Sequence, residues 1–276
     1  VDWFLMSSFF PTLYIILVYV YVVKILGPSL MNTRKPFALK NIMLVYNFAQ
    51  VFISIYLFSE MLGAGWFGKY SFRCQPVDYS NSPDGLRMAW ACYLYYLSKF
   101  TELADTIFFM LRKKNNQITT LHVIHHGLIY FPGFFFQYLF FLGVFLQGCG
   151  HGTFFILLNT FVHIWMYLYY FLAALGPRIQ PYLWWKKHLT TMQIIQFVIV
   201  LIHDLQMFFI ECDFSMICVW SILLHAILFL FMFKDFYNKA YKPKGGKKSE
   251  FNVDGAEVDS HSNLVNKRRR NEVKQE

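Results

Sequence analysis

Long apolar runs recur along the chain and alternate with short polar segments. Six of them are long enough for a helix to cross the hydrocarbon core of a bilayer, which takes about 20 residues. They cover residues 9–26, 42–62, 86–111, 152–175, 189–210 and 215–236. A seventh run, 119–146, is interrupted by Gly127, Pro132 and Gly133, so we expect one crossing that is kinked or broken near Pro132. The pattern predicts an all-α membrane protein with seven transmembrane helices.

Lysine and arginine residues are concentrated in alternate loops between these runs. The basic loops carry Lys24, Arg34, Lys35, Lys40, Arg112, Lys113, Lys114, Arg178, Lys186 and Lys187, and further basic residues follow Lys234. The opposite loops hold Lys69, Arg73 and Arg87. Because cytosolic loops carry the excess of positive charge, we expect the basic loops and the C-terminus in the cytosol and the N-terminus in the lumen or outside the cell.

The composition also indicates a membrane protein. Of the residues, 57% are hydrophobic and 21% aromatic, which is too apolar for a soluble domain of this size. The net charge of +9 comes from residues between the spans, so we predict no nucleic-acid partner. We divide the chain into a transmembrane domain, residues 1–237, and a disordered basic cytosolic tail, residues 238–276. Because the sequence opens with Val1 instead of Met, we expect that an N-terminal piece precedes it.

Two of the five cysteines, Cys74 and Cys212, fall in loops that we place on the lumenal side. The lumen of the secretory pathway is oxidising, so we predict a disulfide between them, with two unpaired loop thiols as the alternative. The chain has no Cys-x-x-Cys motif, so neither a cysteine zinc site nor a redox motif is indicated.

Polar and ionisable residues occur inside several of the apolar runs. His122, His125 and His126 share one helix face in the run 119–146. Such residues are costly in hydrocarbon unless they face a partner or a wet cavity, and they then mark functional sites. The run 86–111 carries Lys99, Glu102 and Asp105, for which a buried ion network that only fixes helix packing is the alternative interpretation.

The runs 152–175 and 189–210 carry further polar faces. On the first lie Asn159, His163, Met166, Tyr167 and Tyr170, and on the second lie Thr190, Gln193 and Gln196. Ordinary interhelical hydrogen bonding is the alternative for the second face. Together the polar faces predict a wet or substrate-filled interior. We predict no role for the isolated histidines, which are His151, His188, His203, His225 and His261.

Clustered histidines first suggest a metal site. Membrane di-iron oxygenases bind their metals with several histidine boxes, whereas this chain has one box among nine histidines, so we predict no metal. An acyl-transfer or carbon–carbon condensing site fits better. An imidazole nitrogen accepts an acyl group or a proton, and Asn, Tyr and Lys side chains stabilise a developing enolate or oxyanion.

Four motifs together resemble the very-long-chain fatty acid elongases, a family of membrane 3-ketoacyl-CoA synthases. They are Lys99-x-x-Glu102-x-x-Asp105-Thr106, His122-x-x-His125-His126, Asn159-x-x-x-His163-x-x-Met166-Tyr167-x-Tyr169-Tyr170 and Thr190-x-x-Gln193-x-x-Gln196. The motifs occur in the family's order, and the resemblance covers about Asp2 to Tyr241.

The resemblance implies a protein of the endoplasmic-reticulum membrane in which six of the seven helices enclose a substrate tunnel. The implied reaction is decarboxylative condensation of malonyl-CoA with a long-chain acyl-CoA to a 3-ketoacyl-CoA, CO2 and CoA, without a cofactor. Expected partners besides the substrates are membrane lipid, other enzymes of the elongation cycle and a second copy of the chain. The cytosolic mouth has basic residues that suit CoA phosphates, although positive-inside bias alone also places them there: Arg112, Lys113, Lys114, Lys186 and Lys187.

The two histidine motifs suggest a mechanism. We expect His125 to take the acyl group from its thioester as an acyl-imidazole, while His163 and Asn159 polarise the malonyl thioester as CO2 leaves. We expect His122 and His126 to orient the nucleophile. Further predicted substrate-binding residues are Lys99, Glu102, Asp105, Tyr167, Tyr170, Gln193 and Gln196.

The chain departs from the family's pattern after His126. It reads Gly127-Leu128-Ile129-Tyr130-Phe131-Pro132, where the family usually continues with Thr or Ser and then a Met-Pro element. We expect the atypical segment 127–150 to affect the tunnel wall, the preferred chain length and activity itself. Two other functions stay open: a catalytically silent elongase-like binding protein and a membrane di-iron fatty acid oxygenase. Chain-length and unsaturation preference and oligomeric state do not follow from the sequence.

Overall fold

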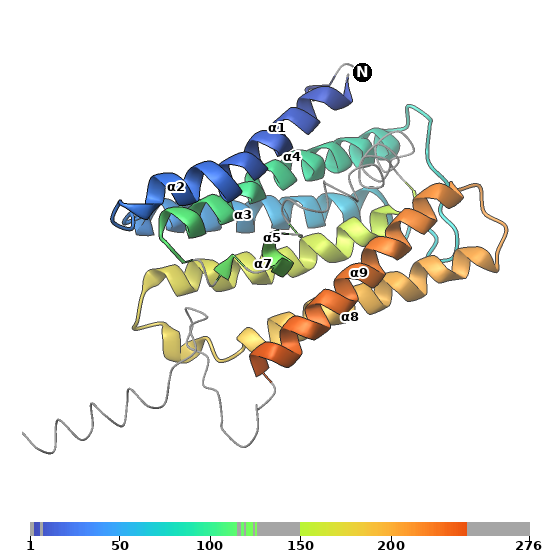
Figure 1. The fold of residues 1–276 in the computed structure, drawn as a ribbon. Coiled ribbons are helices and arrows are strands. Elements are labelled where there is room, and N and C mark those ends of the chain that lie inside the picture. Colours follow the sequence, from blue (N-terminus) through green and yellow to red (C-terminus); the bar gives the residue numbers. More distant parts are fainter. Residues whose placement is uncertain are drawn as a thin grey trace, which may run out of the picture.

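The computed structural model describes residues 3–5, 8–114, 117–118, 120–123, 125 and 150–241, and every regular element within them is helical. The long helices lie side by side as a bundle (Figure 1). The predicted all-helical class is confirmed for these residues. His126, most of the segment 127–150 and the tail beyond residue 241 lie outside the described residues.

Within the described residues, five helical stretches are long and apolar enough to cross a membrane. They correspond to five of the predicted apolar runs. In chain order they consist of α1 (Phe9–Tyr21), a π-helical turn (Val22–Leu26) and α2 (Gly27–Asn32); α3 (Lys40–Met61) and a π-helical turn (Leu62–Trp66); α7 (Thr153–Leu175); α8 (Lys186–Leu205) and a 3-10 turn (Gln206–Phe208); and α9 (Met216–Tyr241).

Two boundaries differ from the apolar runs. The first stretch continues through Gly27-Pro28, because Pro28 lies in the first turn of α2 directly after a π-helical turn, where its missing N–H is tolerated. At the other end, α9 continues to Tyr241, past the predicted end of the membrane domain at residue 237.

α4 (Pro83–Leu111) is the longest described helix, with 29 residues. Ser82 caps its start by accepting a hydrogen bond from the Gly85 N–H at 3.0 Å, and Asp84 lies in its positively polarised first turn. α4 is not among the five stretches above, and it carries Lys99 and Glu102 near its middle. The short α5 (Thr120–Val123) represents the histidine-box run, so the count of seven crossings and the tunnel stay predictions.

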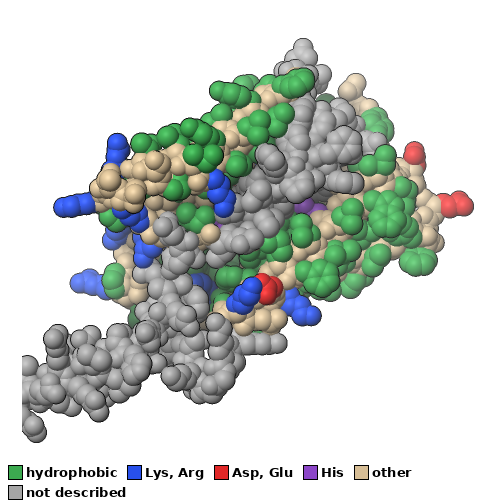
Figure 2. Space-filling model, viewed as in Figure 1, with side chains coloured by type: hydrophobic (Ala, Val, Ile, Leu, Met, Phe, Trp, Pro, Cys, Tyr) green, Lys and Arg blue, Asp and Glu red, His purple; other side chains and the backbone are tan. Residues whose placement is uncertain are grey.

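The helices pack mainly in two pairs. α3 lies against α7 and α8 lies against α9, and α7 also contacts α8. Fully buried side chains from different helices meet in the core, among them Met61, Met88 and Phe229. Outward faces instead expose large apolar side chains such as Val45 and Ile202, and Figure 2 shows how widely hydrophobic side chains cover the surface. Such a surface suits contact with lipid.

The two ends of the bundle differ in charge. Figure 2 shows most of the visible Lys and Arg side chains toward the end where α2 terminates and α7 leads to α8, and most of the visible Asp and Glu side chains at the opposite end. At that opposite end Cys74 and Cys212 form a disulfide, with their Cα atoms 5.7 Å apart. This is the pairing predicted from the sequence, and it joins the segment before α4 to the loop between α8 and α9.

Candidate active site

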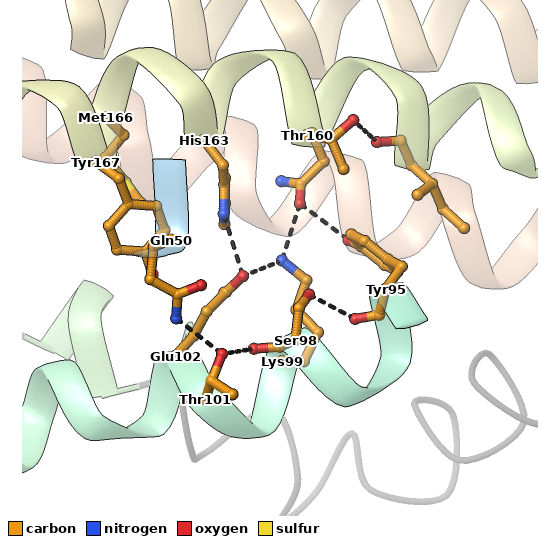
Figure 3. Close-up of polar contacts among 12 residues, drawn as sticks. Gln50, Tyr95, Ser98, Lys99, Thr101, Glu102, Thr160, His163, Met166 and Tyr167 are labelled. Carbon is orange, nitrogen blue, oxygen red and sulfur yellow. Dashed lines mark hydrogen bonds and ion pairs between the residues drawn. The ribbon is translucent and has the colours of Figure 1, made fainter. Parts of the chain in front are cut away.

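Polar side chains of α4 and α7 converge near the middles of the two helices (Figure 3). The Lys99 ammonium donates to Glu102 Oε1 at 2.7 Å and to Asn159 Oδ1 at 3.0 Å. The same Glu102 oxygen lies 3.2 Å from His163 Nδ1. Lys99 and Glu102 are one helical turn apart, as are Asn159 and His163, so each pair shares a helix face. The four residues therefore form one connected network between the two helices.

Three of the four residues are buried, and Lys99 is partly buried. Glu102 is 4% exposed, His163 5% and Asn159 6%. A lone buried charge is strongly disfavoured, so the ammonium and the carboxylate depend on each other. If the network served only to hold α4 against α7, the ion pair between Lys99 and Glu102 would be enough. The additional imidazole and amide supply groups that move protons and donate hydrogen bonds to a substrate.

Tyr95 fixes the orientation of the Asn159 amide. Its hydroxyl donates to Asn159 Oδ1 at 2.9 Å, and the Lys99 ammonium donates to the same oxygen. Because two donors hold the carbonyl oxygen, the amide NH2 group is directed away from them. The arrangement thus presents a donor of fixed direction beside His163.

A second set of contacts ties α4 to the histidine box and to α1. Thr106 Oγ1 lies 2.9 Å from His122 Nε2 and accepts from the Tyr19 hydroxyl at 2.6 Å. Directly before Thr106 in the sequence, Asp105 accepts a hydrogen bond at Oδ2 from the Tyr167 hydroxyl at 3.0 Å. The structure therefore places His122 against the polar face of α4.

His125 lies in an aromatic environment on the side of α9. Its ring is edge-on to the rings of Phe229 and Phe233, with centroids 5.0 and 6.4 Å away. It is also close enough to His163 for the two imidazoles to interact electrostatically. The two histidine motifs thus meet in the same part of the bundle, with an apolar wall beside His125.

The other predicted residues of α7 and α8 are less central. The Gln193 amide is 3.9 Å from Met166 Sδ, which joins α8 to α7. Gln196 is buried at 3% exposure. Tyr170 is 36% exposed, so it lies at the margin of the bundle.

The predicted CoA-phosphate residues belong to the end of α4 and the start of α8, which lie at the basic end of the bundle (Figures 1 and 2). Arg112 and Lys113 follow the last turn of α4 and are followed by Lys114, whereas Lys186 and Lys187 begin α8. The Lys113 ammonium donates to the backbone carbonyl at the end of α2 at 3.3 Å. The Lys187 ammonium lies 5.7 Å from the centre of an aromatic ring of α9. These cations therefore surround the ends of several helices.

Three contributors were not predicted from the sequence. Tyr95 precedes Lys99 by one turn on the same face, so helical periodicity contained the signal. Gln50 of α3 donates to Thr101 Oγ1 at 2.8 Å. A glutamine inside an apolar span indicates a polar partner in the bundle, so the sequence contained this signal as well. No sequence signal pointed to Phe229, because the chain has 32 phenylalanines and the hydrophobic pattern does not distinguish most of them.

The sequence model of the ELO family, described as the GNS1/SUR4 family, matches residues 4–249. The chain belongs to the ELO family. The resemblance predicted from the four motifs is thereby confirmed.

Several ELO relatives cover most of this chain. A very long chain fatty acid elongase of Aedes aegypti is 55% identical over 242 residues, which are 87% of this chain and 66% of that protein. Very long chain fatty acid elongase 7 of Drosophila melanogaster is 51% identical over 247 residues, 89% of this chain and 73% of that protein. Human very long chain fatty acid elongase 1 is 45% identical over 229 residues, 82% of this chain and 80% of that protein. The ELO chain thus spans just under two thirds of the mosquito relative.

Proposed function

We propose that this ELO chain is a very-long-chain 3-ketoacyl-CoA synthase, which condenses a long-chain acyl-CoA with malonyl-CoA to a 3-ketoacyl-CoA, CO2 and CoA. The observation that carries the proposal is the buried network of Lys99, Glu102, Asn159 and His163 near His125. The names of the relatives support the same substrate class.

The first half-reaction transfers the acyl group to His125. A neutral ring nitrogen attacks the thioester carbon, the C–S bond breaks, and the CoA sulfur leaves and takes up the proton lost from the other ring nitrogen. The product is a neutral acyl-imidazole and free CoA. Phe229 and Phe233 offer apolar surface beside the ring, and burying an acyl chain stabilises the complex by about 0.8 kcal/mol per CH2 group.

The second half-reaction forms the carbon–carbon bond. Malonyl-CoA loses CO2, and the electron pair of the broken bond becomes an enolate on the remaining thioester. The Asn159 NH2 group and the Nε2–H of a protonated His163 donate to the enolate oxygen, while Glu102 accepts from Nδ1–H and stabilises the charged ring. The enolate carbon attacks the acyl carbon, and His125 leaves with a proton taken from His163.

The proposal has consequences for the whole chain. The acyl tail lies in a tunnel enclosed by six of the seven helices, and the CoA phosphates lie against the basic residues Arg112, Lys113, Lys114, Lys186 and Lys187. The basic end faces the cytosol and the membrane is that of the endoplasmic reticulum. Residues 1–237 form the catalytic domain and 238–276 the tail. The chemistry needs only the two CoA substrates, and a second copy or other enzymes of the cycle are the proposed partners.

Condensation is tested by transfer of label from malonyl-CoA to a product two carbons longer. The purified chain in detergent is given a panel of saturated and unsaturated acyl-CoAs. We expect the wild type to extend at least one of them and His125→Ala to extend none. His188→Ala is the matched control, because His188 is an exposed histidine of α8 and should be dispensable. A wild type that extends no acyl-CoA contradicts the proposal and favours a silent binding protein.

The carrier role of His125 is tested separately. Incubation with acyl-CoA alone should raise the intact mass of the wild type by one acyl group, and His125→Ala should show no such increase. If the wild type elongates but never carries an acyl adduct, His125 acts as a base in a direct condensation and the carrier step is wrong.

A further inference from the structure

A second cluster of ionisable side chains lies at the disulfide end of the bundle. His151 lies two residues before the start of α7, and His203 and Asp204 lie in the last turn of α8. Their exposed fractions are 0%, 8% and 2%, so the fold encloses all three. The proposed condensation uses none of them.

The three side chains are in mutual contact. The imidazole rings of His151 and His203 stack with centroids 3.9 Å apart and planes inclined by 11°. Asp204 Oδ1 lies 3.7 Å from His151 Nε2 and 3.4 Å from His203 Nδ1. One potential ligand atom from each residue lies within 4.8 Å of the other two.

Each member also keeps a buried polar atom that has no hydrogen-bond partner among the described residues. These atoms are His151 Nδ1, His203 Nε2 and Asp204 Oδ2. Buried polar atoms are nearly always satisfied by protein, ordered water or an ion. The rings of Trp66 and Phe154 flank His203 with centroids 5.8 and 4.1 Å away, which shields the cluster. Three unsatisfied atoms in one enclosed place indicate a bound species.

The main chain fixes the parts of this cluster relative to each other. The N–H of His151 donates to the Gln75 carbonyl at 2.7 Å, and Gln75 is next to Cys74 of the disulfide. The other half-cystine, Cys212, lies in the loop that follows α8. A ligand bound here would therefore join the start of α7 to the end of α8, beside a crosslink that already holds the same loops.

Two imidazoles and one carboxylate are a ligand set that zinc uses in sites with three protein ligands and a water. Tetrahedral bonds of about 2.0–2.1 Å place ligand atoms about 3.4 Å apart, and one candidate ligand atom of each residue already lies within 4.8 Å of the other two. The two imidazole nitrogens also match zinc better than Mg2+ or Ca2+, which prefer oxygen ligands.

We propose that His151, His203 and Asp204 bind one Zn2+ ion, with water as the fourth ligand. Binding requires one of the stacked rings to turn about its Cβ–Cγ bond, so that both nitrogen lone pairs converge on the metal. The site is independent of the condensation proposed above.

Metal analysis of the full-length chain tests the proposal. The protein is purified in detergent with a tag that contains no histidine, dialysed against Zn2+ and then against metal-free buffer, and its zinc is measured by mass spectrometry. We expect one zinc per chain in the wild type and a loss of at least 80% of it in His203→Ala and in Asp204→Asn. His188→Ala replaces another histidine of α8, which is exposed, and should retain the full amount.

Cobalt provides a readout that does not depend on the variants folding. Wild-type protein loaded with Co2+ in place of Zn2+ should show the intense visible absorption of a tetrahedral site, and X-ray absorption should show two imidazoles among the ligands. The proposal is overturned if the wild type holds no stoichiometric metal, if the two site variants retain as much as His188→Ala, or if the absorption spectrum shows no imidazole ligands. In those cases the cluster is a hydrogen-bonded polar core only.

Discussion

Replacing Glu102 by glutamine removes the negative charge between Lys99 and His163 while keeping the shape of the side chain. In the wild type this carboxylate is 2.7 Å from the Lys99 ammonium, 3.2 Å from His163 Nδ1 and only 4% exposed. Removing one partner of a buried ion pair costs about 3–5 kcal/mol, because the other charge is left uncompensated. Lys99 keeps its hydrogen bond to Asn159, so we expect a loss near the lower limit, about 3 kcal/mol.

The same substitution should slow condensation. Glu102 accepts from the ring that donates to the enolate in the proposed mechanism, so its charge stabilises the protonated imidazole. Loss of one donor of an oxyanion site typically lowers kcat by about 10²- to 10³-fold. We expect Glu102→Gln to lower kcat by about 10²-fold at a nearly unchanged KM for acyl-CoA, because the carboxylate does not contact the acyl tail.

Two measurements separate the structural and catalytic effects. The free energy of unfolding is obtained by denaturant titration in detergent, and kcat by incorporation of labelled malonyl-CoA. The double variant Lys99→Met with Glu102→Gln removes both charges, and it should regain most of the lost stability but none of the rate. Wild-type stability and rate in Glu102→Gln would refute this reasoning. A double variant that regains the rate would show that the ion pair only fixes packing.

Three further substitutions test other parts of the structure. Tyr95→Phe removes one hydrogen bond to Asn159, worth about 1 kcal/mol, so kcat should fall about fivefold and the melting temperature by about 2–4 °C. An unchanged rate would refute the orienting role. Phe229→Ala empties a fully buried site and should lower the unfolding free energy by about 3–5 kcal/mol, which a melt in detergent measures against wild type. Cys74→Ser opens a disulfide whose cysteines are 138 positions apart and should cost up to about 5 kcal/mol, whereas Cys74→Ser and wild type should melt alike under reducing conditions.

Helical periodicity predicted which polar residues share a face. The structure confirms this for Lys99 and Glu102, which form an ion pair. It also confirms it for Asn159 and His163, of which the first contacts Lys99 and the second contacts Glu102. Periodicity could not show that Glu102, and not Asp105, would contact His163. Such contacts depend on the axial offset and rotation of one helix against another, which arise from packing along the whole interface.

Residues that lack a nearby partner in the sequence were the hardest to interpret. His151 and His203 are 52 positions apart, and each looked isolated in its own segment. Only the packing of α7 against α8 brings their rings into contact. Apolar runs likewise predicted where the helices lie but not all of their ends, because a π-helical turn let the first stretch continue past Gly27.

The network between α4 and α7 also bears on how the chain is made. The ribosome delivers α4 first, so Lys99 and Glu102 reach the membrane before Asn159 and His163 have been synthesised. A single span with ionised side chains is poorly tolerated in hydrocarbon. Release of α4 from the insertion machinery into lipid is therefore expected to wait for α7, so that residues proposed to act in condensation also control the timing of the protein's biogenesis.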